Sequence, residues 1–268
     1  GPQAALTLAT VELERDRSQA AADGLDAAIK RFPNTPLMPS LMFRMAESLV
    51  RLDRLNDARA KFVEVADRWP SDPWAEPALI RALKLAFAAQ DLDAVRTLTS
   101  AVEKGFPKSS SIPEVRLLAA KALRAGKRGH EAIPILERLL GEASPGVDST
   151  TGSELKLPPD LARQALYELA LAYRDTGLRE KSDATLSTLS KLPEPKSENP
   201  AQASANASIT ADAQFLVGQT AVEAGRFKEA IAPLEAYLRS RPDGDVADSA
   251  LAQLATARIG LGEFEAAS

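Results

Sequence analysis

Residues 215–242 read FLVGQTAVEAGRFKEAIAPLEAYLRSRP. Apolar residues recur in this stretch at spacings of three and four, which places them on one side of a helix. Gly225 interrupts the pattern, and Pro242 ends it because proline lacks the backbone N–H that a helix interior needs. The stretch therefore predicts two helices joined by a tight turn.

Small residues mark the same pattern along the whole chain. They recur at steps of 37, 37, 37, 50, 48 and 37 residues, and the two long steps equal this period with 13 and 11 residues inserted. A proline follows twelve residues later in four units. The small residues are Ala21, Ala58, Val95, Ala132, Ser182, Ala230 and Ala267, and the prolines are Pro33, Pro70, Pro107 and Pro242. Such a period, filled with helical pattern, is typical of stacked helix pairs.

The clearest unit, with Gly218, Gly225, Phe227, Ala230 and Pro242, resembles the tetratricopeptide repeat family. The resemblance implies an all-α, right-handed superhelical solenoid of about six and a half antiparallel helix pairs. Gly218 and Ala230 are expected where the two helices cross, and Ala58 and Ala132 at the equivalent crossings. The period of 37 residues resembles the variant found in bacterial envelope proteins, such as outer-membrane assembly lipoproteins and Tol–Pal-associated proteins.

A single solenoid is expected over residues 1–268. Its repeats are placed near 5–36, 37–73, 74–111, 112–143, 158–192, 208–243 and 244–268, with loop insertions at 144–157 and 193–207. The fourth turn, Lys127 to Gly129, is interpreted as having one extra residue. Gly1 and Pro2 resemble a purification-tag scar. The last unit is expected to stop in mid-repeat, after a first helix from about Asp245 to Leu261, and to self-associate through the apolar face left open.

Composition excludes several kinds of chemistry. The chain has no cysteine and one histidine, His130, which excludes thiolate metal sites, disulfides and multi-histidine metal sites. A net charge of −4, from 33 basic and 37 acidic residues, argues against nucleic acid as a partner. No apolar run approaches the roughly 18 residues that span a bilayer. We therefore expect no catalytic residues, no metal, no cofactor and no transmembrane segment.

The remaining candidate site is a groove along one face of the first helices. The resemblance implies that this face binds protein or peptide, and its basic side chains suit an acidic segment. The alternative is that the basic side chains are ordinary helix surface and the aromatic ones are core. The candidate residues are Phe43, Arg44, Glu47, Arg51, Arg81, Lys84, Phe87, Arg116, Arg124, Tyr167, Arg174, Phe215 and Gln219.

Two functions fit this interpretation. The first is a non-enzymatic interaction scaffold or adaptor of the bacterial cell envelope, and we favour a periplasmic location over a cytoplasmic one. The second is the repeat segment of a larger multidomain enzyme or regulator.

Overall fold

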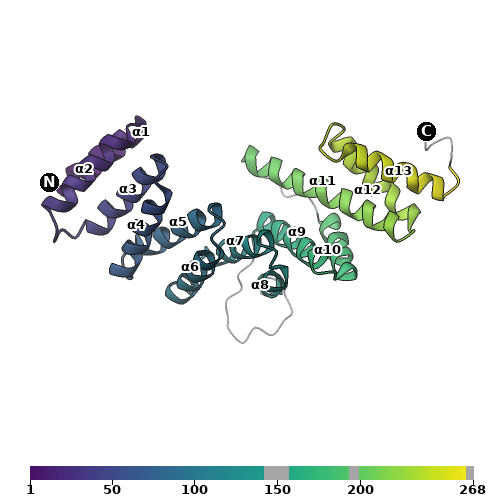
Figure 1. Cartoon of the computed structure of the whole chain (residues 1–268), viewed down its shortest axis with the longest axis horizontal. Coiled ribbons are helices and arrows are strands. Elements are labelled where there is room, and N and C mark those ends of the chain that lie inside the picture. The colour runs from purple at the N-terminus through teal and green to yellow at the C-terminus, as the bar shows by residue number, and fades with distance from the viewer. Residues whose placement is uncertain (142–156, 193–198, 264–268) are drawn as a thin grey trace. The chain divides into compact units, whose positions relative to one another are not determined.

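The computed structural model describes residues 1–141, 157–192 and 199–263, which form thirteen α-helices and no β-strand (Figure 1). The prediction of an all-α fold of helix pairs is confirmed for this part of the chain. The helices are α1 (Pro2–Glu14), α2 (Ser18–Arg31), α3 (Met38–Arg51), α4 (Leu55–Arg68), α5 (Ala75–Ala88), α6 (Leu92–Gly105), α7 (Ile112–Ala125), α8 (Gly129–Gly141), α9 (Pro159–Asp175), α10 (Arg179–Lys191), α11 (Pro200–Glu223), α12 (Phe227–Ser240) and α13 (Ala247–Gly260). None of these helices is long and apolar enough to cross a membrane.

The chain divides into two compact units, Gly1–Ala122 and Leu123–Ser268, and the division falls within α7. In unit 1 the helices from α1 to α6 pack in chain order, from α1 against α2 to α5 against α6, and the first helices α1 and α3 also contact each other. In unit 2 the helices from α8 to α13 pack in the same order, and α11 also contacts α9 and α13. Odd-numbered helices are thus the first and even-numbered helices the second members of the pairs.

The turn after each first helix contains one residue in the left-handed region of backbone space. The described residues contain seven residues with positive φ, and each lies two residues after the end of a first helix. Each also lies five residues before one of the recurring small residues. These left-handed turn residues are Asp16, Asp53, Gln90, Lys127, Gly177, Gly225 and Gly262. The inner turn therefore has the same length in the six repeats whose two helices are both described, and the prediction of an extra residue in the fourth turn is wrong.

Alanine and leucine form most of the core. Ala58, Ala132 and Ala230 are completely buried, as predicted for the crossings between first and second helices. Because alanine carries a single methyl group, it lets two helix backbones approach closely. Leucine side chains such as Leu136 and Leu234 fill the remaining space and are also fully buried. A core of this kind explains why so few aromatic residues suffice.

The second helices end where the recurring prolines predict. Pro33, Pro70, Pro107 and Pro242 each lie two residues after the last residue of a second helix. Proline fixes φ and disfavours helical conformation in the residue before it, so it stops each helix at a defined place. The connection to the next repeat starts there.

The predicted loop at residues 193–207 is wrong from residue 200 onward, because α11 begins at Pro200. The Asn199 side chain accepts hydrogen bonds from the backbone N–H groups of Ala201 and Gln202, and Pro200 occupies the first turn, where its missing N–H costs nothing. An N-cap followed by proline is a helix start signal that the Pro- and Ser-rich composition concealed. The other predicted loop, 144–157, lies outside the described residues except for its last position.

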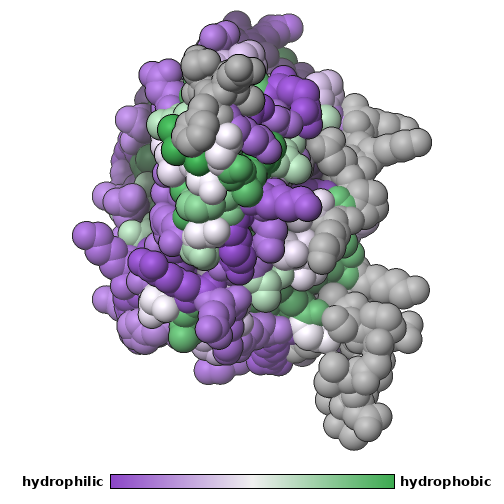
Figure 2. All heavy atoms as spheres, turned by 90° about the vertical axis from the view of Figure 1, so that its right-hand side faces the viewer, coloured by the Kyte–Doolittle hydropathy of each residue, from purple (hydrophilic) through white to green (hydrophobic). Residues whose placement is uncertain are grey.

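Helix α13 carries apolar side chains on two faces. Its inner face, with Ala250, Leu254 and Ala257, is buried against α12. Its outer face exposes Leu251 and Ile259, whose relative exposures are 52% and 54%. Figure 2 views the molecule from the side of α12 and α13 and shows apolar atoms gathered in one area of this surface.

Candidate partner-binding pocket

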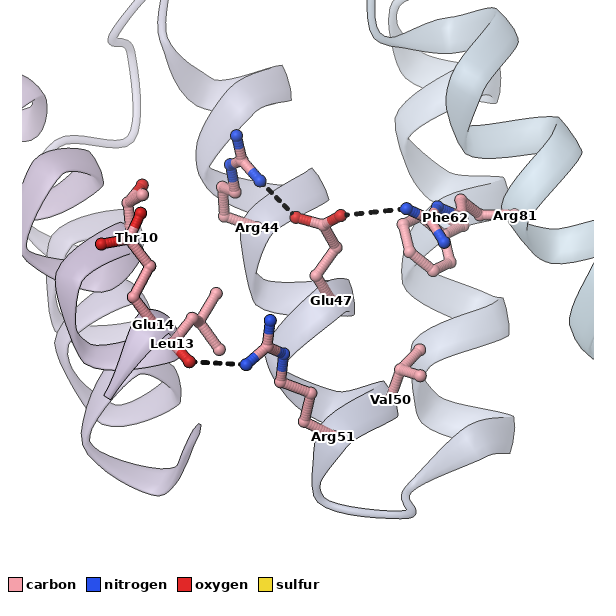
Figure 3. Close-up of a pocket in the computed structure, with 9 residues that line it drawn as sticks. All are labelled: Thr10, Leu13, Glu14, Arg44, Glu47, Val50, Arg51, Phe62 and Arg81. Atoms are coloured by element: carbon pink, nitrogen blue, oxygen red, sulfur yellow. Dashed lines mark hydrogen bonds and ion pairs between the residues drawn. The ribbon is translucent and has the colours of Figure 1, made fainter. Parts of the chain in front are cut away.

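Helices α1, α3 and α5, which are the first members of the helix pairs in unit 1, surround a pocket with a cavity volume of about 480 Å³ (Figure 3). Helix α1 contributes three residues, α3 four, α4 one and α5 one. We call this cavity the unit 1 pocket, and its lining residues are Thr10, Leu13, Glu14, Arg44, Glu47, Val50, Arg51, Phe62 and Arg81. Four of the predicted groove residues therefore lie together: Arg44, Glu47, Arg51 and Arg81.

Glu47 stands between two of the arginines. Its Oε2 accepts a hydrogen bond from Arg44 Nη1 at 2.6 Å, and its Oε1 lies 3.6 Å from Arg81 Nη2 (Figure 3). The guanidinium of Arg44 also lies over the Trp74 ring, 5.6 Å from its centroid. Arg44 is therefore held on two sides, whereas Arg81 has only a long contact.

Arg51 connects α3 to the end of α1. Its Nη1 donates a hydrogen bond of 2.5 Å to the carbonyl oxygen of Leu13, which lies in the last turn of α1. Carbonyl groups at a helix C-terminus carry partial negative charge and lack partners within the helix, so a guanidinium is favourable there. In the described part of the chain no carboxylate pairs with Arg51.

The floor of the pocket is apolar. Leu13 and Phe62 are buried, and Val50 is half-buried. Charged side chains at the edge and apolar side chains below give two kinds of contact for one ligand. This combination suits a protein segment that carries both apolar and charged side chains.

The lining residues share a register that explains why they lie together. All except Phe62 lie nine, six, three or two residues before the left-handed turn residue that follows their helix. Arg44 and Arg81 lie at nine, Thr10 and Glu47 at six, Leu13 and Val50 at three, and Glu14 and Arg51 at two. The sequence analysis missed Thr10, Leu13 and Glu14 because the first repeat is a weak match. Counting back from Asp16 instead would have found them.

Two predicted groove residues of unit 1 are buried instead, which corrects the prediction for them. Phe43 is 4% exposed and lies ten residues before its turn residue, so its ring packs against Phe62 and Trp74 with centroid distances of 5.2 and 4.5 Å. Arg116 is 9% exposed, and its Nε donates to Glu103 Oε1 at 2.6 Å. Its assignment depended on the extra residue that the fourth turn does not have.

The other two predicted residues of unit 1 lie outside the pocket. Lys84 is exposed and pairs with Glu114 at 2.8 Å. Phe87 is partly buried against the core of unit 1. Neither side chain adds an uncompensated charge to the pocket.

The predicted residues of unit 2 form contacts of their own. Arg124 pairs with Glu168 at 2.6 Å and lies 3.7 Å from Asp175. Burial alone would lower the pKa of Arg124, but the hydrogen bond that Arg124 donates to Glu168 and the charges of Glu168 and Asp175 raise it above its usual value. Burial, with Asp212 and Glu168 nearby, raises the pKa of Tyr167 to about 12. Both groups therefore keep their ordinary protonation state at neutral pH.

Further along unit 2, Arg174 Nη2 donates to Gln219 Oε1 at 3.0 Å. The ring of Phe215 lies 5.5 Å from that of Tyr237, within the core formed by α11 and α12. The first contact joins the neighbouring first helices α9 and α11, and the second joins the two helices of one pair. The described residues provide no group of three or more potential metal ligands. Whether any of these residues binds a partner stays a prediction.

Comparison with known proteins agrees with the helix-pair fold. Residues 6–73 and 201–245 match the family model for the tetratricopeptide repeat. No curated protein matches the chain.

Solved structures with the same fold cover almost the whole chain. A tetratricopeptide repeat protein from Parabacteroides merdae has a TM-score of 0.59 at 13% identity, over 99% of this chain and 89% of that one. The apo form of the quorum sensor NprR from B. thuringiensis has a TM-score of 0.54 at 11% identity, over 99% and 84%.

A third structure is a signal transduction ATPase with numerous domains from Pyrococcus horikoshii, which has a tetratricopeptide repeat sensor. It has a TM-score of 0.61 at 15% identity and covers 99% of this chain but 41% of that one. At identities this low, the structural similarity shows a common fold and nothing further. Parts of both units thus match the tetratricopeptide repeat model, and the chain has the helix-pair fold of these solved structures.

Proposed function

We propose that the chain is a non-enzymatic protein–protein interaction scaffold and that its unit 1 pocket binds an extended segment of a partner protein. The observation that carries this proposal is that α1, α3 and α5 line one cavity of about 480 Å³ with side chains drawn from one set of four register positions. The cavity combines an apolar floor with charged edges, which are the contacts that a protein segment offers.

The test fills the pocket and measures binding directly. Peptides are first selected from a random library with the wild-type chain, and their affinities are then measured for Val50→Trp and for Thr97→Trp. Val50 lies in the pocket floor, whereas Thr97 is exposed on α6, away from the pocket. We expect Val50→Trp to weaken binding at least tenfold, which corresponds to about 1.4 kcal/mol, and Thr97→Trp to leave it unchanged. Equal affinities for the two variants would show that the pocket is not the binding site.

A second function is favoured by one comparison. The archaeal signal transduction ATPase carries its tetratricopeptide repeats as a sensor within a longer chain. By analogy, we propose as the alternative that this chain is the partner-sensing segment of a larger regulator. The mass of the native protein on an immunoblot decides between the two, since a product much larger than 28.6 kDa supports the sensor segment.

Our proposal for the cellular location rests on the period of the repeat alone. The 37-residue spacing supports a place in the bacterial cell envelope, and we propose the periplasm over the cytoplasm. Fractionation of the native cells tests this, because recovery of the protein only with cytoplasmic markers would contradict it.

A further inference from the structure

The charges of the unit 1 pocket do not cancel. Three guanidinium groups line it, those of Arg44, Arg51 and Arg81, against the two carboxylates of Glu14 and Glu47. Arg44 is fixed by Glu47 and by the ring of Trp74. The pocket therefore has one positive charge in excess, and Arg51 and Arg81 are its less firmly paired guanidinium groups.

Arg81 is held loosely. Its contact with Glu47 Oε1 measures 3.6 Å, which is longer than a charge-assisted hydrogen bond of roughly 2.7–2.9 Å, and its side chain is 58% exposed. Exposed ion pairs of this kind contribute little to stability. A carboxylate from outside can therefore replace Glu47 at Arg81 at small cost, while Glu47 keeps its 2.6 Å bond to Arg44.

Arg51 has its charge only partly compensated. One of its nitrogens is bound to the carbonyl oxygen of Leu13, and the guanidinium carries five N–H donors in all. Its side chain is directed into the pocket in Figure 3. The remaining donors and the full positive charge are available to a ligand.

We propose that Arg51 and Arg81 form a subsite for acidic side chains of the bound partner segment, and that Glu47 occupies this subsite in the free protein as an internal competitor. The proposal rests on the function proposed above, since it assumes that the pocket binds a protein segment. The Glu47 carboxylate lowers the affinity for acidic segments in two ways, by holding Arg81 and by repelling the incoming negative charge. Only a segment with an acidic residue at the right place displaces it.

The test measures whether removal of the Glu47 carboxylate raises or lowers the affinity for an acidic peptide. The probes are fluorescein-labelled octaglutamate and octaglutamine with blocked ends, followed by fluorescence anisotropy at low ionic strength, where screening is weak. We expect Glu47→Gln to bind octaglutamate at least threefold more tightly than wild type. Adding Arg81→Gln to Glu47→Gln should abolish this gain, and octaglutamine should show none.

Glu114→Gln is the matched control, because it also removes one carboxylate from unit 1. Glu114 pairs with Lys84 at 2.8 Å outside the pocket, so its removal changes the net charge equally without freeing Arg81. If Glu47→Gln binds octaglutamate no better than Glu114→Gln does, or less well than wild type, Glu47 is not a competitor. A gain of the same size with an octaglycine peptide that has a free C-terminus would overturn the assignment to side chains. The Val50→Trp test of the pocket itself is independent of all these outcomes.

Discussion

The side chain of Leu234 fills the space that a side chain on Gly218 would need. A Cβ atom added to Gly218 would lie 2.4 Å from Leu234 Cγ and 2.7 Å from its Cδ2. Gly218 lies on α11 and Leu234 on α12, so this contact sets how closely the two helices of the sixth pair approach. Glycine is required here by the neighbouring helix and not by its own backbone conformation.

Gly218→Ala should therefore destabilise unit 2. Alanine normally stabilises a helix interior by about 0.5–1 kcal/mol relative to glycine, but overpacking costs about 1–3 kcal/mol, so we expect a net loss. Gly24→Ala on α2 is the control, because nothing lies within 4 Å of its added Cβ, and it should raise the stability. Urea unfolding of the two variants measures both effects. A more stable Gly218→Ala protein would contradict the packing described here.

Ala230→Leu should also overpack the crossing between α11 and α12. Ala230 is completely buried, so a larger side chain has no space, and we expect a loss of about 1–3 kcal/mol. Ala232→Leu, on the exposed side of the same helix, should change the stability by less than about 0.5 kcal/mol. Thermal unfolding of the pair compares them, and equal midpoints would count against the repeat alignment.

Gln90→Gly should stabilise the chain. Gln90 has a φ of 55°, in the left-handed region that costs a residue with a Cβ roughly 1 kcal/mol and glycine almost nothing. Gly225→Ala is the reverse experiment, since Gly225 has a φ of 71° and should lose about 1 kcal/mol on substitution. Chemical unfolding should show shifts of opposite sign, and a destabilised Gln90→Gly variant would refute the common turn geometry.

Tyr173 should make the stability depend on pH in the alkaline range. Burial, and the hydrogen bond that its hydroxyl donates to Glu137 Oε1 at 2.5 Å, raise its pKa from 10.0 to about 12. A raised pKa in the folded state means that the protonated phenol stabilises the fold below pH 10 and that this contribution is lost as the pH rises towards 12.

The free energy of unfolding of Tyr173→Phe should therefore fall less between pH 10 and 12 than that of wild type. Ultraviolet absorbance of tyrosinate gives a direct check. The variant should lack one phenol that titrates near pH 12, and loss of a step near pH 10 instead would refute the raised pKa.

Helix α13 should drive self-association. Its exposed Leu251 and Ile259 leave an apolar surface in contact with water, and such surfaces associate. Light scattering over a concentration series should show a rising average mass for wild type and a constant mass for Leu251→Ser/Ile259→Ser. Leu8→Ser/Leu55→Ser, which removes two exposed leucines elsewhere, should behave like wild type. If Leu8→Ser/Leu55→Ser had a constant mass and Leu251→Ser/Ile259→Ser did not, the contact would lie on another surface.

The repeat architecture could be predicted because two independent signals agreed. Small residues such as Ala58 and Ala230 recur with one period, and prolines such as Pro70 and Pro242 follow them at a fixed distance. The turns were harder to place. Glycine occupies only three of the seven left-handed turn positions, and Lys127 or Gln90 gives no sign in sequence of adopting a positive φ.

Part of the candidate site could be predicted from the same repeat pattern. Arg44, Glu47, Arg51 and Arg81 were correctly placed on one surface because their helices matched the repeat pattern well. A shift of one residue along a helix rotates a side chain by about 100°, which is how Phe43 came to be assigned to the groove instead of the core. The pairing of Glu47 with Arg44 and Arg81 could not be read from sequence, because it depends on side-chain conformations.

The constant length of the inner turn also limits where the gene can gain or lose codons. In the six pairs of helices that the structure describes in full, each left-handed turn residue lies at the same distance from both of its helices. The two long steps add residues between α8 and α9 and in the N-terminal part of α11, which has 24 residues. A helix pair therefore behaves as a cassette whose interior has one permitted length and whose borders accept new sequence. Duplication or deletion of whole cassettes alters how many surfaces the array presents without disturbing any of its folds.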